Sequence, residues 1–249
     1  MQTAPIPAAT LVVFRDTGAG PPDLLIVERA KAMAFAGGAL VFPGGRIDPG
    51  DVALAETLGA AEDGAARIAA IRETIEEAGI AIGLDPRPDI ATLARMRAAL
   101  HGGEPFGRVL AAAGLRLDLD ALVPFARWLP RHAGMRIFDT RFFLARLPDG
   151  AGEASADQTE NTRLFWGSAR DVLAEADAGR ATIIFPTRRN LERLAQFADF
   201  AAAVDHAQAY PQRTITPWNE DRDGVPHLCI PDDLGYPVTA QPLADAARG

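Results

Sequence analysis

The chain has 249 residues, of which 48% are hydrophobic and 23% are charged, and its net charge at pH 7 is −8. This length suffices for one large hydrophobic core, whereas the negative charge argues against a general binder of nucleic acids or anionic membranes, because neither would be attracted.

The apolar runs of the chain are shorter than the ~20 residues that span a bilayer. The single cysteine, Cys229, cannot form an internal disulfide, and the first residues lack the basic and apolar regions of a signal peptide. We therefore expect a cytoplasmic protein.

Strand-like patterns dominate the beginning of the chain. β-rich runs cover residues 8–15 and 23–28, and the Gly- and Pro-rich residues 17–22 between them predict a hairpin connection. A third short strand at 39–42 leads directly into the glycine pair Gly44 and Gly45. Paired glycines allow positive φ angles and a close approach of a ligand to the main chain.

Two helical patterns follow the glycine pair. Residues 51–58 predict a short helix capped by Asp51, and residues 65–78 predict a longer one that ends at Gly79. In the longer helix, three isoleucines recur at helical spacing and are expected to face the core: Ile68, Ile71 and Ile75. The rest of this helix surface can then present polar groups.

The remaining elements mix helices and strands without strict alternation, which is typical of an α/β sandwich around a mixed sheet. They are helices at 90–100 and 106–113, strands at 122–129, 136–147 and 162–166, a helix at 168–178 capped by Ser168, a strand at 181–185, and a helix from 186 to about 202. Beyond residue 210 the chain is rich in proline and predicts short strands or an irregular tail.

Three glutamates lie within little more than one turn of the longer helix. Glu73, Glu76 and Glu77 are spaced i, i+3 and i+4, so their side chains share one helix face. Like charges at this spacing destabilise a helix by ~0.2–0.5 kcal/mol per pair, and a bound cation would reverse that penalty. Hard ions such as Mg²⁺ prefer carboxylate oxygens. A solvated acidic face is the alternative, and the glycine pair upstream favours the metal site.

The glycine pair and the glutamates together resemble the Nudix box of pyrophosphohydrolases. That box runs Gly, five residues, Glu, seven residues, and then Arg-Glu-aliphatic-x-Glu-Glu-x-Gly-aliphatic. Arg72 opens a match to the second half, with Thr74 in an aliphatic position. In the first half, Gly45 is followed after five residues by Asp51 in place of Glu, and twenty residues instead of seven then precede Arg72. Asp51 is either a helix N-cap or a group with a role at the metal, and an insertion at about 52–64 interrupts the box.

The resemblance implies a fold and a domain organisation. The expected fold is a Nudix-type α/β/α sandwich around a mixed β-sheet, with a helical insertion and an irregular C-terminal extension. Residues 1–206 form the expected domain, with a further helical segment at about 89–114, and residues 207–249 form the extension that packs on it.

The resemblance also implies a metal site. Glu76, Glu77 and the carbonyl of Gly45 are the expected ligands of Mg²⁺ or Mn²⁺. Glu73 is either a further ligand or the base that orients the attacking water. Arg72 is expected to orient the carboxylates by ion pairing rather than to touch the substrate.

Further site residues follow from the same resemblance. Gly44, Gly45 and Arg46 are expected to contact the substrate at the glycine loop. Family members often supply a catalytic carboxylate from outside the box, and Glu160 is the expected residue here, with Asp157 as the second choice.

The insertion resembles one found in a branch related to peroxisomal coenzyme A diphosphatases. Residues 122–130, 136–145 and 184–187 resemble the same branch. Residues 25–45 resemble a segment of coenzyme A hydrolases that contains two arginines. Arg29 matches the first arginine, whereas the second falls on Ala34. Lys31 can supply the missing charge, though without bidentate geometry. Other basic candidates for a phosphate contact are Arg127, Arg136 and Arg141.

The leading interpretation is hydrolysis of coenzyme A or acyl-coenzyme A to 3′-phosphoadenosine 5′-phosphate and a phosphopantetheine. The acidic charge of the chain does not exclude such an anionic small molecule, because bound divalent ions invert the local field. The alternatives are hydrolysis of an ADP-sugar, a dinucleotide or NADH, and a Nudix-like module that senses a nucleotide without cleaving it. The complete glutamate set favours turnover. The sequence leaves the oligomeric state open, a homodimer included.

Overall fold

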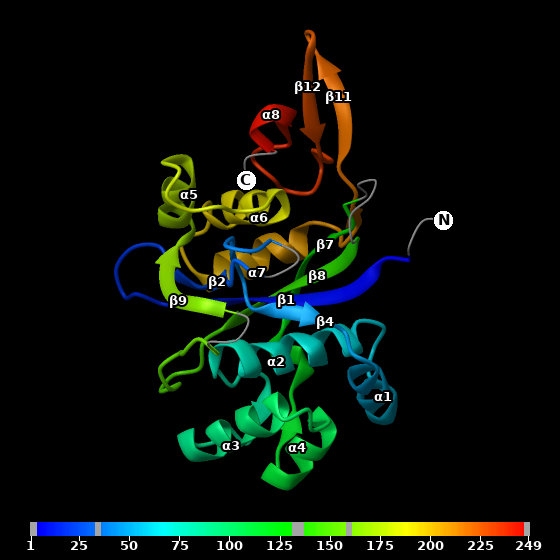
Figure 1. Cartoon of the computed structure of the whole chain (residues 1–249), viewed down its shortest axis with the longest axis vertical. Coiled ribbons are helices and arrows are strands. Elements are labelled where there is room, and N and C mark those ends of the chain that lie inside the picture. Colours follow the sequence, from blue (N-terminus) through cyan, green and yellow to red (C-terminus); the bar gives the residue numbers. More distant parts are fainter. Residues whose placement is uncertain (1–3, 33–35, 131–136, 158–160, 247–249) are drawn as a thin grey trace.

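The computed structural model describes residues 4–32, 36–130, 137–157 and 161–246. A mixed β-sheet lies at its centre, with helices on both faces (Figure 1). The predicted α/β sandwich around a mixed sheet is therefore confirmed. Among the described residues, no helix combines the length and the apolar composition required to cross a bilayer. The domain boundary between residues 206 and 207 stays a prediction.

The central sheet joins strands from distant parts of the chain. The order β10-β7-β8-β1-β2-β3 runs across it, β4 pairs with β1, and β9 pairs with β2. The β1–β8 and β7–β10 pairs are parallel and the other pairs are antiparallel. The bounds are β1 Ile6–Arg15, β2 Asp23–Arg29, β3 Leu40–Val41, β4 Gly44–Arg46, β7 Val123–Trp128, β8 Phe138–Arg146, β9 Asn161–Ser168 and β10 Thr214–Ile215.

Helices from the first half of the chain lie together on one side of the sheet, and those from the second half lie on the other (Figure 1). The first group contains α1 Pro49–Leu58, α2 Gly64–Ala78, α3 Ile90–His101 and α4 Phe106–Ala113, with the short strands β5 Leu84–Asp85 and β6 Arg116–Leu117 and a 3₁₀ turn Leu119–Ala121. The second contains α5 Ala169–Asp177, α6 Phe185–Leu194 and α7 Phe200–Ala209.

Alternation along the strands creates one hydrophobic core on each face. Leu11 and Val13 of β1 pack in the core under α2, whereas Val12 and Phe14 pack in the core under α6 and α7. Successive strand residues point to opposite faces, so an apolar strand such as β1 can supply both cores.

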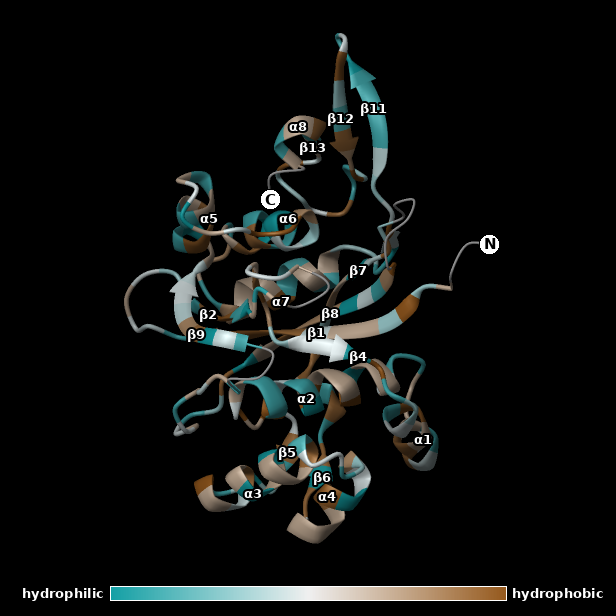
Figure 2. Ribbon diagram, in the orientation of Figure 1, coloured by the Kyte–Doolittle hydropathy of each residue, from teal (hydrophilic) through white to brown (hydrophobic). Residues whose placement is uncertain are grey.

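The end of the chain forms a small sheet of β11 Trp218–Arg222, β12 Val225–Cys229 and β13 Ala240–Pro242, followed by α8 Leu243–Ala246. The β11–β12 hairpin projects from the body, and β11 is hydrophilic and exposed along its length (Figure 2). The following segment returns to the body, because Ile230, Leu234 and Tyr236 are buried in the core under α6.

Several predicted elements are confirmed in detail. Helix α2 ends at Gly79, whose φ of 64° is the left-handed conformation that a helix C-cap requires. The three isoleucines of its apolar stripe are fully buried: Ile68, Ile71 and Ile75. Ser168 caps α5 by accepting a hydrogen bond from the backbone of Asp171.

The predicted cap of the insertion helix was wrong. Helix α1 begins at Pro49, its N-cap is Asp48, and Asp51 occupies the third helical position. The Asp51 carboxylate accepts a hydrogen bond from the backbone of Asp48 at 2.9 Å, which is the reciprocal half of a capping box. Proline is favoured in the first helical turn, because its missing N–H has no helical partner there.

Two further element predictions were wrong. Residues 181–185 do not form a strand, since the segment makes one isolated parallel bridge between Ala39 and Thr182 and α6 already begins at Phe185. The predicted helix at 186–202 is two helices, because α6 ends at Leu194 and Asp199 starts α7 by accepting a hydrogen bond from Ala202. Asp is a strong N-cap, so it competes with continuation of the preceding helix.

Replacing the α7 cap tests this break. Asp199→Ala removes the hydrogen bond to the backbone of Ala202 and is expected to lower the free energy of unfolding by about 1 kcal/mol. Thermal or urea denaturation measures the change. Gln208→Ala, at an exposed position of the same helix, is the matched control and is expected to change stability by less than ~0.5 kcal/mol. Equal stabilities of the two variants would contradict the assigned cap.

Candidate active site

The glycine strand β4 lies beside α2 (Figure 1), against the glutamates of that helix. The backbone N–H of Gly44 donates a hydrogen bond to Glu77 Oε2 at 2.9 Å, and the Glu77 side chain is only 4% exposed. A Cβ at position 45 would overlap the Glu73 carboxylate. Only glycine therefore lets the main chain approach the helix this closely.

Arg72 lies at the centre of the carboxylate cluster and is 7% exposed. Its Nε and Nη2 donate to both carboxylate oxygens of Asp51 at 3.1 and 2.8 Å. Its Nη1 donates to Glu73 Oε1 at 2.8 Å and to Glu76 Oε1 at 3.2 Å. A further bond of 2.9 Å reaches the carbonyl oxygen of Arg46. One guanidinium thus joins α1, α2 and β4.

Asp51 shows how the insertion fits into the site. Its side chain is 1% exposed, and its oxygens are occupied by Arg72 and by the backbone of Asp48. The bidentate pair with Arg72 is a strong, charge-assisted interaction. Helix α1 therefore folds back and returns Asp51 to the start of the glutamate cluster, although twenty residues separate it from Arg72.

The electrostatics of the cluster reflect burial of several like charges. Burial raises the pKa of Glu73 to about 8, in concert with the negative charges of Glu77 and Glu76 and against the lowering effect of Arg72. For Arg72, burial opposes the charged form, but the hydrogen bond to Asp51 and the surrounding carboxylates raise its pKa above the ordinary value. The cluster has more negative than positive charge, which favours an additional cation.

The cluster offers several carboxylate oxygens beside the glycine backbone of β4. Hard divalent cations prefer oxygen ligands of this kind. Within the described ranges, no three acidic, histidine or cysteine groups converge as a ready ligand set. The reason is visible in the hydrogen bonds, because Arg72 holds Glu73 and Glu76 while Gly44 holds Glu77.

Arg97 of α3 stabilises the end of the glutamate helix. Its guanidinium donates to the carbonyl oxygens of Glu76 at 2.9 Å and Glu77 at 3.0 Å, and to the hydroxyl and carbonyl oxygens of Ser155 at 2.8 Å. A cation at a helix C-terminus interacts favourably with the helix dipole. No sequence pattern predicted a role for Arg97, because an arginine on an amphipathic helix carries no local sign of a distant partner.

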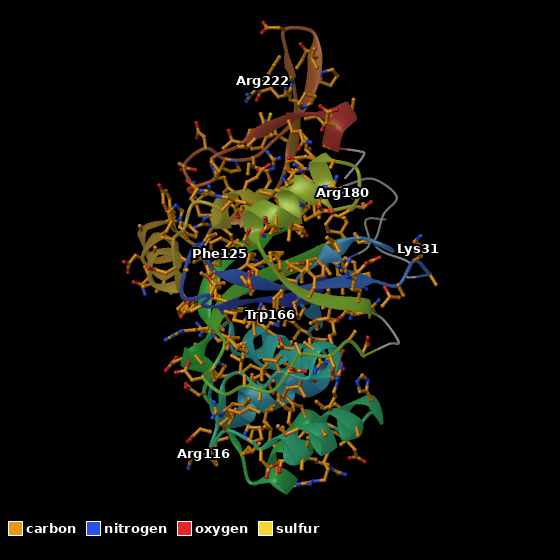
Figure 3. All side chains as sticks on the ribbon, turned by 90° about the vertical axis from the view of Figure 1, so that its left-hand side faces the viewer. Lys31, Arg116, Phe125, Trp166, Arg180 and Arg222 are labelled. Atoms are coloured by element: carbon orange, nitrogen blue, oxygen red, sulfur yellow. The ribbon has the colours of Figure 1, made fainter. Side chains whose placement is uncertain are left out.

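Two of the predicted substrate-contacting basic residues lie at or just after the end of β2, and the third lies in β4. Arg29 is the last residue of β2 and is half-buried. Lys31 is exposed and extends outward at the edge of the molecule (Figure 3), and its stem approaches Gly38. Arg46 is exposed in β4, and only its carbonyl oxygen contacts Arg72.

The other basic candidates are engaged or fall outside the described residues. Arg127 forms a bidentate pair with Asp139 at 2.8 and 2.7 Å, and Arg141 lies 3.4 Å from a carboxylate oxygen of Glu62. The predicted catalytic Glu160 and the candidate Arg136 both lie outside the described residues. Asp157, the second choice for the catalytic carboxylate, accepts a hydrogen bond from the backbone of Asn161.

Comparisons with known proteins show what this chain resembles. A crystal structure of a NUDIX hydrolase from Alicyclobacillus acidocaldarius superposes with a TM-score of 0.73 and 30% sequence identity, over 82% of this chain and 97% of that chain. A provisionally named nudix hydrolase 7 from Caenorhabditis elegans is 25% identical over 222 residues, which are 86% of this chain and 69% of the relative. No family model matches the chain.

The buried Asp51–Arg72 pair yields a stability prediction. Asp51→Ala leaves the buried guanidinium without its bidentate partner and is expected to cost about 3–5 kcal/mol, measured by urea denaturation. Asp48→Ala is the matched control, because Asp48 lies 3.6 Å from the same guanidinium but its side chain is 59% exposed; this change is expected to cost about 1 kcal/mol. Similar losses in the two variants would contradict the central position of the buried pair.

Proposed function

Since this chain belongs to the Nudix hydrolase superfamily, we propose that it uses a divalent cation to hydrolyse the diphosphate bond of a nucleoside-diphosphate-linked substrate, with coenzyme A or an acyl-coenzyme A as the leading candidate. One observation carries the proposal: the glutamate face of α2 lies directly against the glycine strand β4. This arrangement concentrates carboxylates beside a backbone that carries no side chains at Gly44 and Gly45.

The proposed ligands of the cation are Glu76, Glu77 and the carbonyl oxygen of Gly45, with Glu73 as a further ligand or as the base. A bound Mg²⁺ or Mn²⁺ would neutralise phosphate charge and polarise the attacking water. The N–H of Gly44 holds the Glu77 carboxylate in place. Arg72 acts as a positioning residue, because its guanidinium fixes the side chains of Glu73 and Glu76 and is itself buried.

A catalytic carboxylate outside the cluster remains part of the proposal. Glu160 is the proposed residue, and it follows the loop that Arg97 fastens to the end of α2 through Ser155. The hydrogen bond from the backbone of Asn161 to Asp157 closes the same loop at the start of β9. Arg97 thus connects Ser155, in the described segment before residue 158, to the end of the glutamate helix.

The coenzyme A assignment is supported by two basic residues at and just after the end of β2. Arg29 and Lys31 lie near the turn that leads to the glycine strand, whereas Arg127 and Arg141 are engaged with carboxylates. The alternatives are another substrate such as an ADP-sugar, a dinucleotide or NADH, and a sensor that binds without cleaving. The complete set of Glu73, Glu76 and Glu77 favours turnover over the sensor.

A substrate panel tests the proposal. Coenzyme A, acyl-coenzyme A, NADH, ADP-ribose and diadenosine compounds are incubated with the protein, with and without Mg²⁺ or Mn²⁺, and the products are separated by chromatography. Metal-dependent release of 3′-phosphoadenosine 5′-phosphate is the expected result. Cleavage of another compound alone would reject coenzyme A and retain the chemistry. Binding of these compounds without cleavage would favour the sensor.

Removing one proposed ligand gives a direct prediction. Glu77→Gln keeps the shape of the side chain and an acceptor for Gly44 but removes the charge, so kcat/KM is expected to fall about 100-fold or more. The rise in Tm on adding millimolar Mg²⁺ is expected to shrink as well, because less binding free energy stabilises the folded state. Glu56→Gln, at an exposed position of α1, is the control. Unchanged kinetics and an unchanged Mg²⁺-induced shift in Glu77→Gln would reject the ligand assignment.

A further inference from the structure

Asn161, the first residue of β9, carries an unexplained polar group. Its side chain is fully buried, and within the described part of the chain neither its Oδ1 nor its Nδ2 has a hydrogen-bond partner. Burying an unpaired amide destabilises a fold, and nearly all buried polar groups in proteins are paired. A partner from outside the chain would explain why asparagine occupies this position.

Strand β9 lies beside β2 (Figure 1), and their register places Asn161 opposite Arg29. The register skips Thr162 at a bulge in β9, so the alternation along β2 continues without interruption from Leu25 through Val27 to Arg29. Leu25 packs in the core under α2, and every second strand residue shares a face. Arg29, with Asn161 beside it, therefore lies on the sheet face that carries the glutamate helix.

Arg29 adds a second unpaired donor to this position. Its Nε is buried and has no hydrogen-bond partner among the described residues. Residues directly opposite in an antiparallel pair have Cβ atoms ~4.5–5.5 Å apart. The two side chains therefore start from neighbouring positions, and a guanidinium N–H and an amide N–H together suit an acceptor with negative charge, such as a phosphoryl oxygen.

Both residues are connected to the candidate active site. The backbone N–H of Asn161 donates to Asp157 in the loop that Arg97 fastens to the carbonyl oxygens of Glu76 and Glu77. On the other side, the backbone N–H of Arg29 donates to the carbonyl oxygen of Ala39. From Ala39 the chain reaches Gly44 in five residues, a span of at most ~18 Å.

We propose that Asn161 and Arg29 form an anion subsite that binds a phosphoryl oxygen of the substrate beside the glutamate face of α2. The proposal rests on the proposed function, because it assigns two residues to the phosphate-bearing substrate of that site. The unpaired amide of Asn161 then lowers the stability of the free protein and raises its affinity for the substrate, since the amide is paired only when the substrate is bound.

The test combines thermal unfolding with a diphosphate ligand that cannot be hydrolysed. Tm is measured at a fixed Mg²⁺ concentration, with and without millimolar adenosine 5′-(α,β-methylene)diphosphate. Asn161→Leu is expected to raise Tm of the free protein by about 3 °C, because an apolar side chain of similar size replaces an unpaired amide. The ligand-induced rise in Tm is expected to fall to less than half of the wild-type value.

Asn190→Leu is the matched control, because Asn190 is also fully buried and its Nδ2 also has no partner among the described residues, but its Oδ1 accepts hydrogen bonds from Trp128 Nε1 and the Tyr236 hydroxyl. This variant is expected to lower Tm and to keep the ligand-induced shift in full. Asn161→Asp, which has the same size, repels a phosphate and is expected to reduce the ligand-induced shift independently of any change in folding.

Three results would overturn the subsite: a lower Tm in Asn161→Leu, an unchanged ligand-induced shift in both Asn161 variants, or no shift in the wild-type protein. Kinetics separate this outcome from failure of the proposed function. Hydrolysis by the wild type with an unaltered KM in both Asn161 variants rejects the subsite alone. Loss of the ligand-induced shift in both variants, with no hydrolysis across the substrate panel, retains the subsite and rejects turnover.

Discussion

The rest of the site depends on the burial of one guanidinium among carboxylates. Arg72 holds Asp51 through two hydrogen bonds and also reaches Glu73 and Glu76. Burying a charge is unfavourable unless it is well paired, so the fold must bring these acidic groups to Arg72. By doing so it fastens the insertion helix, the glutamate helix and the glycine strand to one another.

The same region tolerates interactions that weaken the fold. Burial, together with the neighbouring carboxylates, raises the pKa of Glu73 to about 8, and the side-chain amide of Asn161 has no partner among the described residues. Local costs of this kind are typical of functional sites, whereas the rest of a natural sequence supports its fold consistently. In this protein such costs lie around α2 and at the start of β9, and they also occur on α6 of the opposite face, where Arg189 Nε, Asn190 Nδ2 and Glu192 Oε2 have no partner among the described residues.

Local sequence signals predicted the elements that are governed by local physics. The stripe of Ile68, Ile71 and Ile75, the left-handed cap at Gly79 and the side-chain cap at Ser168 all appear in the structure as expected. The errors arose where a competing local signal was overlooked. Asp199 divides the predicted helix at 186–202 into two, and Asp48 takes the capping position that was predicted for Asp51.

The sequence alone determined the helix that presents three carboxylates, the glycines that face it and the α/β class, because periodicity, caps and turn residues act over a few neighbouring positions. Tertiary structure decided which distant groups meet. The return of Asp51 to Arg72 across the insertion and the pairing of Arg29 with Asn161 depend on how helices and strands pack and align. Strand register and helix packing arise from the whole core, so no local pattern encodes these contacts.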